Sequence, residues 1–268
     1  MARFQDKVVI VTGSSNGIGR ATALLFAQEG AKVTITGRNE GRLEETRQEI
    51  IKSGVSEGNV LAIVADITTE DGQNKLINST VEKFGRLDIL VNNAGAAFMD
   101  EKGNVGVAQD VSVYDRIMAT NLRSVVSLTQ KASEHLKSSK GEVVNVSSIA
   151  AGPQAYPTFM YYAMSKAALD QYTKSAALDL IKFGIRVNSV SPGAVTTGFG
   201  QAMGMPMDMA DKMWKDMEKT IPVGFIADPV DIANVIAFLA DRKVSRYIIG
   251  QSIVADGGSI LVLPDLEM

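Results

Sequence analysis

The sequence predicts an α/β fold in which a doubly wound parallel sheet of about seven strands lies between two layers of helices, a three-layer αβα arrangement. Short runs rich in Val and Ile alternate with longer segments of helical periodicity along the chain. The short runs are apolar at consecutive positions, which is typical of strands buried on both faces. No internal repeat, low-complexity tract or linker interrupts this alternation. We therefore expect residues 1–268 to form one domain.

The first half of the chain contains four strand-like runs and three helical segments. Each short run is bounded by polar or glycine residues, whereas each helical segment is too long for a strand. The helix expected at 20–29 has an apolar side formed by Ala21, Leu24, Leu25 and Phe26. In chain order, we expect strands at 8–11, 33–36, 60–64 and 89–91, and helices at 20–29, 40–52 and 69–84.

The second half continues the pattern but contains two unusual stretches. We expect strands at 143–146, 187–190 and 252–255, and long helices at about 112–137 and 157–182. Residues 96–110 form a longer connection than is usual between such elements. Residues 198–223 carry a methionine cluster around Trp214, made of Met203, Met205, Met207, Met209, Met213 and Met217.

Composition excludes several classes of protein. The formal net charge of -3 and the pI near 5.4 give no sign of a nucleic-acid-binding surface. The chain has no cysteine and one histidine, so we expect no metal site and no Ser/His/Asp hydrolase. Its N-terminus enters a strand almost directly instead of a signal peptide, and no apolar run approaches the roughly 20 residues that span a bilayer. We expect a cytoplasmic protein with no membrane span.

A glycine-rich turn follows the first strand. Gly13, Gly17 and Gly19 stand in the pattern TGxxxGxG, directly before the first helix. Glycines let a backbone approach a ligand closely, and a helix N-terminus offers free N–H groups to an anion. A lone glycine triplet could be an ordinary tight turn, and this one matches neither GxGxxG nor the P-loop. Its place between strand and helix nevertheless predicts a site for a dinucleotide pyrophosphate.

A tyrosine and a lysine lie one helical turn apart at Tyr162 and Lys166. A nearby cation favours the phenolate, so we expect Lys166 to lower the pKa of Tyr162 toward the range of an acid–base catalyst. Of the neighbouring tyrosines, Tyr156 and Tyr161 lack a lysine four residues on. The alternative is a pair on a helix surface. Together with the glycine turn, the pair indicates hydride transfer.

The end of the second strand indicates which dinucleotide is bound. An acidic residue at this position binds the adenosine 2′-hydroxyl of NAD, and an arginine nearby accommodates the 2′-phosphate of NADP. This chain has Gly37 and Arg38 there, and Glu40 comes too late. We therefore predict NADP(H) in preference to NAD(H). The alternative is that Arg38 is a solvated residue that opens the next helix.

Taken in order, these motifs resemble those of the short-chain dehydrogenase/reductase family, in its single-domain branch similar to carbonyl and tropinone reductases. The resemblance covers roughly residues 7–258. It implies a Rossmann-type sheet of strand order 3-2-1-4-5-6-7, and a homotetramer or homodimer with an interface formed by the helices at 112–137 and 157–182. The motifs that carry it are Thr12-Gly13-xxx-Gly17-Ile18-Gly19, Asn92-Asn93-Ala94-Gly95, Asn121, Ser148, Tyr162-xxx-Lys166 and Pro192-Gly193.

The resemblance also implies a catalytic set. Tyr162 exchanges a proton with the substrate oxygen, Ser148 hydrogen-bonds that oxygen, and Lys166 also binds the nicotinamide ribose. Asn121 helps to hold a water that relays protons. Gly152 follows Ser148 by four residues where the family usually has three. This apparent insertion leaves Ser147 as an alternative to Ser148.

For the cofactor, the resemblance implies contacts at the ends of several strands. The pyrophosphate would lie on the glycine turn, the adenine at Asp66 and Ile67, and the ribose on the segment after the fourth strand. The implied cofactor residues are Gly13, Ser15, Asn16, Gly17, Ile18, Gly19, Arg38, Asn39, Asp66, Ile67, Asn93, Ala94, Gly95, Tyr162, Lys166, Pro192, Gly193, Val195 and Thr197.

The predicted function is an NADP(H)-dependent oxidoreductase that interconverts a ketone and a secondary alcohol. The family carries its substrate lid at the position of residues 198–223, and methionines there favour an apolar substrate. One alternative is an NAD-dependent dehydrogenase of a steroid, a sugar or another secondary alcohol. A second is a non-catalytic dinucleotide-binding sensor, against which the intact Ser148, Tyr162 and Lys166 set argues.

Overall fold

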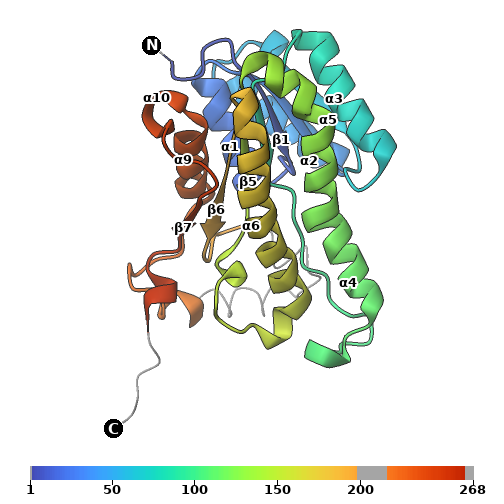
Figure 1. Ribbon diagram of the computed structural model, residues 1–268, viewed down its shortest axis with the longest axis vertical. Coiled ribbons are helices and arrows are strands. Elements are labelled where there is room, and N and C mark those ends of the chain that lie inside the picture. Colours follow the sequence, from blue (N-terminus) through green and yellow to red (C-terminus); the bar gives the residue numbers. More distant parts are fainter. Residues whose placement is uncertain (1, 198–215, 263–268) are drawn as a thin grey trace.

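The computed structural model describes residues 2–197 and 216–262, which are built around a seven-stranded sheet (Figure 1). The strand order is β3-β2-β1-β4-β5-β6-β7, and every pair of neighbours is parallel. This order confirms the predicted doubly wound topology. The strands are β1 (Val8–Thr12), β2 (Lys32–Gly37), β3 (Val60–Val64), β4 (Ile89–Asn92), β5 (Glu142–Val146), β6 (Arg186–Pro192) and β7 (Ser252–Ala255).

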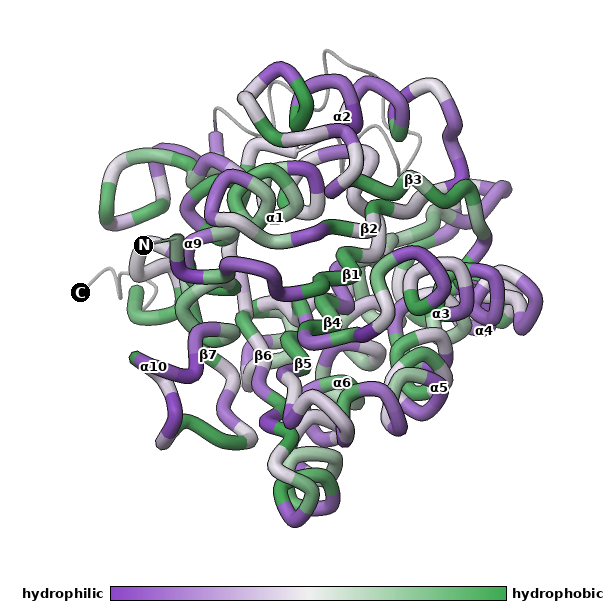
Figure 2. The backbone as a smooth tube through the Cα atoms, turned by 90° about the horizontal axis from the view of Figure 1, so that it is seen from above, coloured by the Kyte–Doolittle hydropathy of each residue, from purple (hydrophilic) through white to green (hydrophobic). Residues whose placement is uncertain are grey.

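Helices cover both faces of the sheet, as the tube view from above shows (Figure 2). One layer contains α1 (Gly17–Gln28), α2 (Glu40–Lys52) and α9 (Pro229–Ala240). The other contains α3 (Glu70–Phe84), α4 (Val111–Met118), α5 (Ser124–Ser139) and α6 (Met160–Leu180). A short helix, α10 (Arg242–Ser245), follows α9.

The alternation of side chains along β1 explains why the sheet needs two helical layers. Val9 and Val11 belong to the core on one face, together with Phe26 of α1. Val8 and Ile10 belong to the core on the other face. All four valine and isoleucine side chains of this strand are at most 1% exposed. A strand buried on both sides must be apolar at every position, which is the pattern that the sequence shows.

Side-chain caps fix where three of the helices begin. The side chains of Asn16, Asn39 and Thr69 accept hydrogen bonds from backbone N–H groups in the first turns of α1, α2 and α3. The first helix begins at Gly17, three residues before the predicted start, because the second and third glycines of the turn already have helical hydrogen bonding. The other predicted elements in this half agree within one or two residues.

The helix expected at 112–137 is interrupted. A π-helical segment, Ala119–Arg123, separates α4 from α5 and contains the buried Asn121. Such single-turn π segments often occur at functional sites because they re-aim one side chain. Periodicity alone did not predict this interruption, since one extra residue in a turn leaves most of the apolar pattern unchanged.

The predicted lid at 198–223 lies mostly outside the described residues, as does Trp214. Of the methionine cluster, Met217 is described, with an exposed fraction of 38%. Among residues 2–197 and 216–262, no helix is long and apolar enough to cross a bilayer.

Candidate active site

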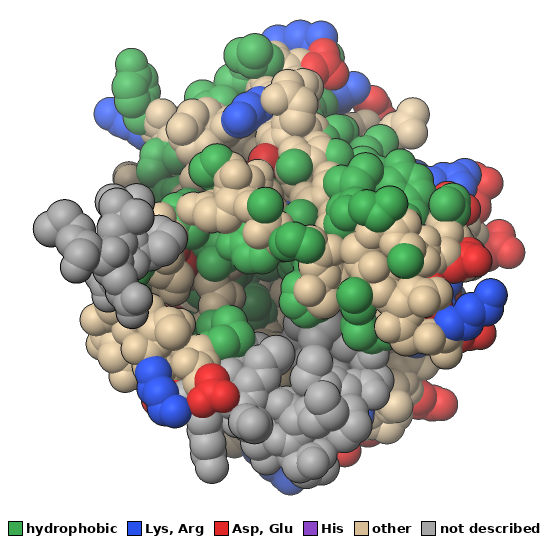
Figure 3. Space-filling view, turned by 90° about the horizontal axis from the view of Figure 1, so that it is seen from below, with side chains coloured by type: hydrophobic (Ala, Val, Ile, Leu, Met, Phe, Trp, Pro, Cys, Tyr) green, Lys and Arg blue, Asp and Glu red, His purple; other side chains and the backbone are tan. Residues whose placement is uncertain are grey.

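A cavity of about 800 Å³ lies along the carboxyl edge of the sheet. It collects the turns that follow six of the strands, which is where open α/β sheets bind their ligands. Every predicted site residue except Gly19 and Asn121 lines it. Seen from below, hydrophobic side chains surround a hollow in this face of the molecule (Figure 3).

The glycine turn leaves no room for side chains. Gly13 has a φ of +64°, and a Cβ there would lie 2.8 Å from the Cα of Ala94. Gly17 has a φ of +51°, and its Cβ would lie 2.9 Å from the Cγ2 of Thr197. Both positions therefore require glycine for conformation and for space. The α1 N-terminus consequently faces the cavity with its backbone N–H groups close to any ligand.

Gly19 supports the turn from behind. It does not line the cavity, and a Cβ there would overlap both the side-chain nitrogen of Asn93 and the carbonyl oxygen of Gly13. The third glycine therefore allows α1 to pack against the turn and the end of β4. Its role is to permit close packing, whereas the sequence pattern suggested direct contact with the cofactor.

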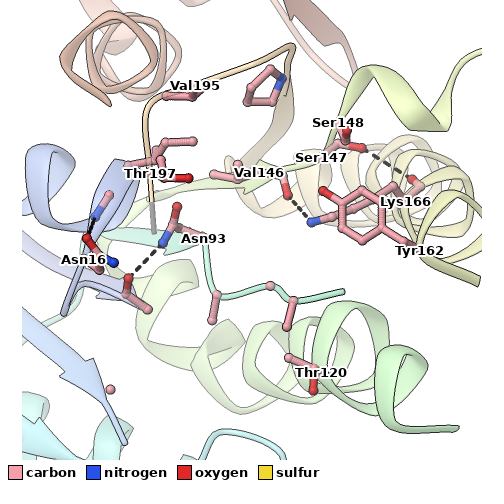
Figure 4. Close-up of a pocket in the computed structure, with 18 of the residues that line it drawn as sticks. Asn16, Asn93, Thr120, Val146, Ser147, Ser148, Tyr162, Lys166, Val195 and Thr197 are labelled. Atoms are coloured by element: carbon pink, nitrogen blue, oxygen red, sulfur yellow. Dashed lines mark hydrogen bonds between the residues drawn. The ribbon is translucent and has the colours of Figure 1, made fainter. Parts of the chain in front are cut away.

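Thr12 and Asn93 bind the ends of β1 and β4 together. The Oγ1 of Thr12 accepts hydrogen bonds from the backbone N–H groups of Asn93 and Ala94, each at 3.0 Å. The Nδ2 of Asn93 donates to the carbonyl oxygens of Thr12 at 2.8 Å and Gly13 at 3.2 Å (Figure 4). These bonds hold the loop after β4 against the glycine turn across the point where the sheet reverses its strand order.

Two arginines lie at the adenosine end of the cavity. Arg38 follows β2, and Arg42 lies in the first turn of α2; both are exposed and line the cavity. Within the described part of the chain, neither forms an ion pair with a carboxylate. A Cβ at Gly37 would lie 3.0 Å from the Oγ of Ser15, so a longer side chain at this position would crowd the glycine turn. This end of the cavity carries two cations and no acidic residue at the end of β2.

Asp66 lies beside them, after β3. Burial raises the pKa of its carboxyl, but hydrogen bonds from the backbone N–H and the hydroxyl of Thr68, with the charge of Arg38, lower the pKa overall below its ordinary value. The two bonds measure 2.9 and 2.7 Å. The ionised carboxylate therefore holds its own turn in shape and leaves the Ile67 side chain on the cavity wall.

The opposite end of the cavity brings Ser148, Tyr162 and Lys166 together (Figure 4). Ser148 follows β5, and its side chain shares a hydrogen bond with that of Tyr162. Lys166 is only 3% exposed; its Nζ donates to the carbonyl oxygen of Val146 at 2.8 Å and lies 5.7 Å from the ring centroid of Tyr162. Residues from β5 and α6 thus form one wall of the cavity.

The pKa of Tyr162 differs from the sequence prediction. Burial raises the pKa of Tyr162 to about 12, and the hydrogen bond with Ser148 offsets part of this rise. Burial also lowers the pKa of Lys166 to about 8. The net shift is opposite to the lowering that the sequence predicted, because desolvation of the phenolate outweighs any stabilisation by a cation that is hydrogen-bonded to Val146.

The two adjacent serines have different surroundings. Ser147 is buried, and its Oγ is directed toward the backbone of α6, where the carbonyl oxygen of Lys166 lies at 3.4 Å. Ser148 caps a 3-10 turn formed by residues 149–151, with its Oγ accepting from the N–H of Ala150 at 3.1 Å. Of the two serines, Ser148 is the one paired with Tyr162.

Asn121 lies behind the wall and does not line the cavity. Its Oδ1 accepts from the N–H of Ala96 at 2.8 Å, and its Nδ2 donates to the carbonyl oxygen of Ala96 and to the Oγ of Ser165, both at 3.0 Å. It therefore anchors the loop after β4 to α6. A Cβ at Gly95 would lie 3.2 Å from the Nζ of Lys166 and 3.5 Å from this Oδ1, so the two polar groups approach the same glycine.

Comparisons with known proteins agree with this geometry. Residues 13–259 match the family described as Enoyl-(Acyl carrier protein) reductase. The 3-oxoacyl-[acyl-carrier-protein] reductase FabG of Thermotoga maritima is 35% identical over 260 residues, which cover 97% of this chain and 100% of that protein. A short-chain dehydrogenase/reductase of Caenorhabditis elegans, solved with its cofactor, is 61% identical with a TM-score of 0.96, and 97% of each chain is covered.

The chain belongs to the short-chain dehydrogenase/reductase family. A second solved structure, glucose dehydrogenase of Caenorhabditis elegans in its apo form, is 56% identical with a TM-score of 0.85, covering 97% of this chain and 100% of that one. Members of this family are oxidoreductases that bind a nicotinamide dinucleotide. The residues along the cavity fit such a cofactor, since the close-packed glycine turn, the α1 N-terminus and the two arginines all present donors to phosphate groups.

Several cavity residues were not predicted from the sequence. Arg42 lies in the first turn of α2, four residues after Arg38. This spacing is the feature of the sequence that could have predicted its place on the cavity wall. Others gather at the catalytic end, where no family motif marks them. These residues are Thr120, Ile149, Ala150, Tyr156, Phe159 and Met217.

Substitution of Gly19 by alanine tests the packing of the glycine turn. We expect Gly19→Ala to destabilise this family member by about 1–3 kcal/mol, since the new Cβ overlaps Asn93 and the Gly13 carbonyl. Gly41→Ala in α2 is the control, because its Cβ would meet only the Asn39 side chain at 3.6 Å. Thermal unfolding measures both variants. Equal melting temperatures for Gly19→Ala and the wild type would contradict the proposed packing.

Removing the buried cation should stabilise the protein. The pKa of Lys166 in the fold, about 8, lies below its ordinary value of 10.5, so the unfolded chain holds this proton more tightly. We expect Lys166→Met to raise the free energy of unfolding at pH 7 by about 1 kcal/mol or more. The gain should shrink as pH rises from about 8 to about 10.5, where the wild-type protein becomes relatively more stable.

Chemical denaturation over this pH range measures the effect, with Lys174→Met as the control. Lys174 is exposed on the same helix, so its removal should leave the free energy of unfolding nearly unchanged. A Lys166→Met variant that is less stable than the wild type at pH 7 would show that the lysine is not under strain from burial.

Proposed function

We propose that this protein is an NADP(H)-dependent reductase of apolar ketones, which also catalyses the reverse oxidation of the secondary alcohols. The observation that carries the proposal is the hydrogen bond between Ser148 and Tyr162 on the cavity wall, with Lys166 buried beside them. This group places a proton donor, a second hydroxyl and a cation at the end of the cavity opposite the adenosine-side arginines.

When bound, the nicotinamide dinucleotide supplies or accepts the hydride. Tyr162, whose pKa near 12 keeps it protonated at neutral pH, donates its proton to the substrate oxygen during reduction and recovers it during oxidation. Ser148 hydrogen-bonds the same oxygen and stabilises the charge that builds there. Lys166, in contact with the cavity, stabilises the phenolate left by proton transfer.

The proposed preference for NADP(H) rests on the end of the cavity that carries Arg38 and Arg42. Arg38 and Arg42 form no ion pair within the described residues, and both line the cavity, where they can bind a phosphate group. A 2′-phosphate is dianionic or nearly so, and paired guanidinium groups bind it well. An acidic side chain in place of Gly37 would have favoured NAD(H), but the sequence has none and Ser15 leaves little space for one.

The proposed preference for apolar ketones rests on the side chains that line the cavity beside Ser148 and Tyr162. Ile149, Ala150, Phe159 and Met217 are apolar, and Tyr156 adds an amphipathic ring. No Lys or Arg other than the catalytic Lys166 is among the described residues at this end of the cavity. Such walls stabilise a hydrophobic ketone by removing its apolar surface from water.

A sugar is the second candidate substrate. The similarity to glucose dehydrogenase of Caenorhabditis elegans favours it, at 56% identity over nearly the whole of both chains. A polyhydroxylated substrate needs several polar partners, because each buried hydroxyl without one costs free energy. The described lining offers few beyond Ser148, Tyr156 and Tyr162, so we place this candidate second.

We further propose that the chain forms one domain and assembles as a homodimer or homotetramer through α4, α5 and α6. Large apolar side chains are exposed on the last two of these helices, which supports an interface there. They include Val126 at 36%, Met164 at 47% and Leu178 at 77% exposure. Light scattering of the purified protein would determine the state.

Cofactor binding tests the assignment of the two arginines. We expect NADPH to bind more tightly than NADH, and each of Arg38→Ala and Arg42→Ala to weaken NADPH binding about tenfold or more, since each removes a charge-assisted hydrogen bond. NADH affinity should change little. Nicotinamide fluorescence titration measures the dissociation constants of both cofactors for the wild type and the two variants.

Arg47→Ala is the matched control, because Arg47 lies on the same helix but pairs with Glu44 and Glu57. Its NADPH affinity should equal that of the wild type. Equal or tighter binding of NADH by the wild type would sink the NADP(H) assignment and direct the search toward alcohol oxidation.

Ketone reduction tests the catalytic set. With NADPH and a panel of alkyl-substituted cyclohexanones and aromatic ketones, we expect the Tyr162→Phe rate to fall by a factor of about 100 or more, since the proton donor is lost. Ser148→Ala should also be impaired. Tyr161→Phe is the control: this hydroxyl donates instead to the Gln109 carbonyl at 3.3 Å, and the variant should keep its rate.

The same panel includes glucose and other aldoses with NAD and NADP. Turnover of sugars with no turnover of ketones would replace the first substrate class with the second. Unchanged ketone reduction by Tyr162→Phe would refute the catalytic assignment, and cofactor binding without turnover of any compound would support a non-catalytic sensor.

A further inference from the structure

Asp170 lies one helical turn beyond Lys166 on α6 and takes no part in the site described above. Residues four apart share one face of a helix, so Lys166 and Asp170 face the sheet together. Asp170 is half-buried and does not line the cavity. A carboxylate in this position requires explanation, because burial without partners is costly.

Hydroxyl groups from three strands face Asp170. Ser147, at the end of β5, shares a side-chain hydrogen bond with it. The Oγ of Ser189 in β6 lies 3.4 Å from its Oδ1, and the Oγ of Ser252 in β7 lies 3.5 Å from the same atom. Ser252 is hydrogen-bonded in turn to Ser191 at 2.7 Å. Together these serines and Asp170 form a polar cluster between α6 and the sheet.

Among residues 2–197 and 216–262, the charges that shift the ionisation of this carboxylate lie on α6 itself. They are Lys166 and Lys174, and both lower the pKa of Asp170, whereas burial raises it above its ordinary value overall. In the opposite sense, the Asp170 charge raises the pKa of Lys166 against the larger lowering by burial. The groups that face Asp170 from β5, β6 and β7 are the serine hydroxyls.

The ammonium group of Lys166 needs this support. It is 3% exposed, and the protein acceptor that the structure places on its Nζ is the Val146 carbonyl. Among the described residues, Asp170 is the one carboxylate whose charge raises the pKa of Lys166 appreciably. A buried ammonium without a nearby anion loses its proton more readily. Ser147 also contacts both residues, since its Oγ lies 3.4 Å from the Lys166 carbonyl.

We propose that Asp170 is a positioning residue for the reaction: held by Ser147, Ser189 and Ser252 one helical turn from Lys166, its negative charge helps to keep Lys166 protonated beside Tyr162. The inference rests on the proposed function for its catalytic consequence. The effect of the Asp170 charge on Lys166 can be tested without turnover, because the ionisation of Lys166 can be followed directly.

The direct test is NMR of protein labelled with ¹³C and ¹⁵N lysine, in which the Lys166 signal is the one absent from Lys166→Met. We expect Asp170→Asn to lower the titration midpoint of Lys166 by about one pH unit, since the neutral amide keeps the shape and loses the charge. Asp170→Ser, a smaller neutral side chain, is the second variant and should shift the midpoint in the same direction. An unchanged midpoint in a folded variant would overturn the proposal.

Two further variants separate charge from structure. Lys174→Met removes the exposed lysine whose charge also acts on Asp170. The titration midpoint of Lys166 in this variant should stay within a small fraction of a pH unit of the wild-type value. Ser147→Ala removes a hydrogen bond but no charge, so its shift should be smaller than that of Asp170→Asn. A shift in Ser147→Ala as large as in Asp170→Asn would assign the effect to packing and overturn the proposal.

The kinetic test uses ketone reduction at varied pH. Above the wild-type midpoint for Lys166, kcat/KM of Asp170→Asn should fall about tenfold below wild type, because a one-unit shift changes the protonated fraction by that factor. At pH values well below the midpoint of the variant, the two rates should converge. A uniform loss at every pH would indicate a merely structural role and overturn the proposal.

The ketone-reducing activity of the wild-type protein distinguishes failure of the proposed function from failure of the coupling between Asp170 and Lys166. If the wild type reduces no ketone while Asp170→Asn still lowers the Lys166 midpoint, the proposed function fails and the Asp170–Lys166 coupling stands. If the wild type is active and neither the midpoint nor the pH profile changes, the coupling fails and the proposed function stands.

Discussion

The tie between the ends of β1 and β4 is the constraint on which the site depends. The Thr12 hydroxyl receives two backbone N–H groups from the segment after β4, and the Asn93 side chain donates back to the glycine turn. This contact lies where the strand order reverses, the place at which doubly wound sheets bind ligands. Because the two loops are drawn so close, Gly13 and Gly19 can carry no side chain. The shape of the cavity beside the glycine turn follows from this packing.

Burial sets the chemistry at the other end of the cavity. Taking Tyr162 and Lys166 out of water raises the pKa of the phenol to about 12 and lowers that of the ammonium to about 8. The phenol remains a proton donor over the neutral range, which suits carbonyl reduction. Lys166 stays protonated near neutral pH, and burying its charge lowers the free energy of unfolding. Active sites commonly reduce the stability of a protein in this way. The carboxylate on the next turn of α6, behind the cavity wall, belongs to the same electrostatic arrangement.

Most of the fold could be predicted because its signals are local. A run such as Val8–Val11 is apolar at every position only if both faces are covered, and this predicts the parallel sheet. The glycine turn and the spacing of Tyr162 and Lys166 are local signals too, whereas most of the other site residues at strand ends were predicted from the resemblance to the family. Arg42 and Tyr156 were not, because cavity contact depends on how loops fold together. The sign of the Tyr162 pKa shift was also beyond the sequence: spacing to Lys166 is local, whereas desolvation is set by the whole surrounding packing.

In the proposed reaction, hydride passes between the nicotinamide ring and a carbonyl carbon held at Ser148 and Tyr162. The most direct measurement uses NADPH deuterated at either C4 position, with a ketone that the enzyme reduces. Mass spectrometry then follows the label. We expect one of the two labelled cofactors, and not the other, to place deuterium on the carbinol carbon of the alcohol. An alcohol without deuterium from either cofactor would contradict the account, as would oxidation of NADPH with no alcohol formed.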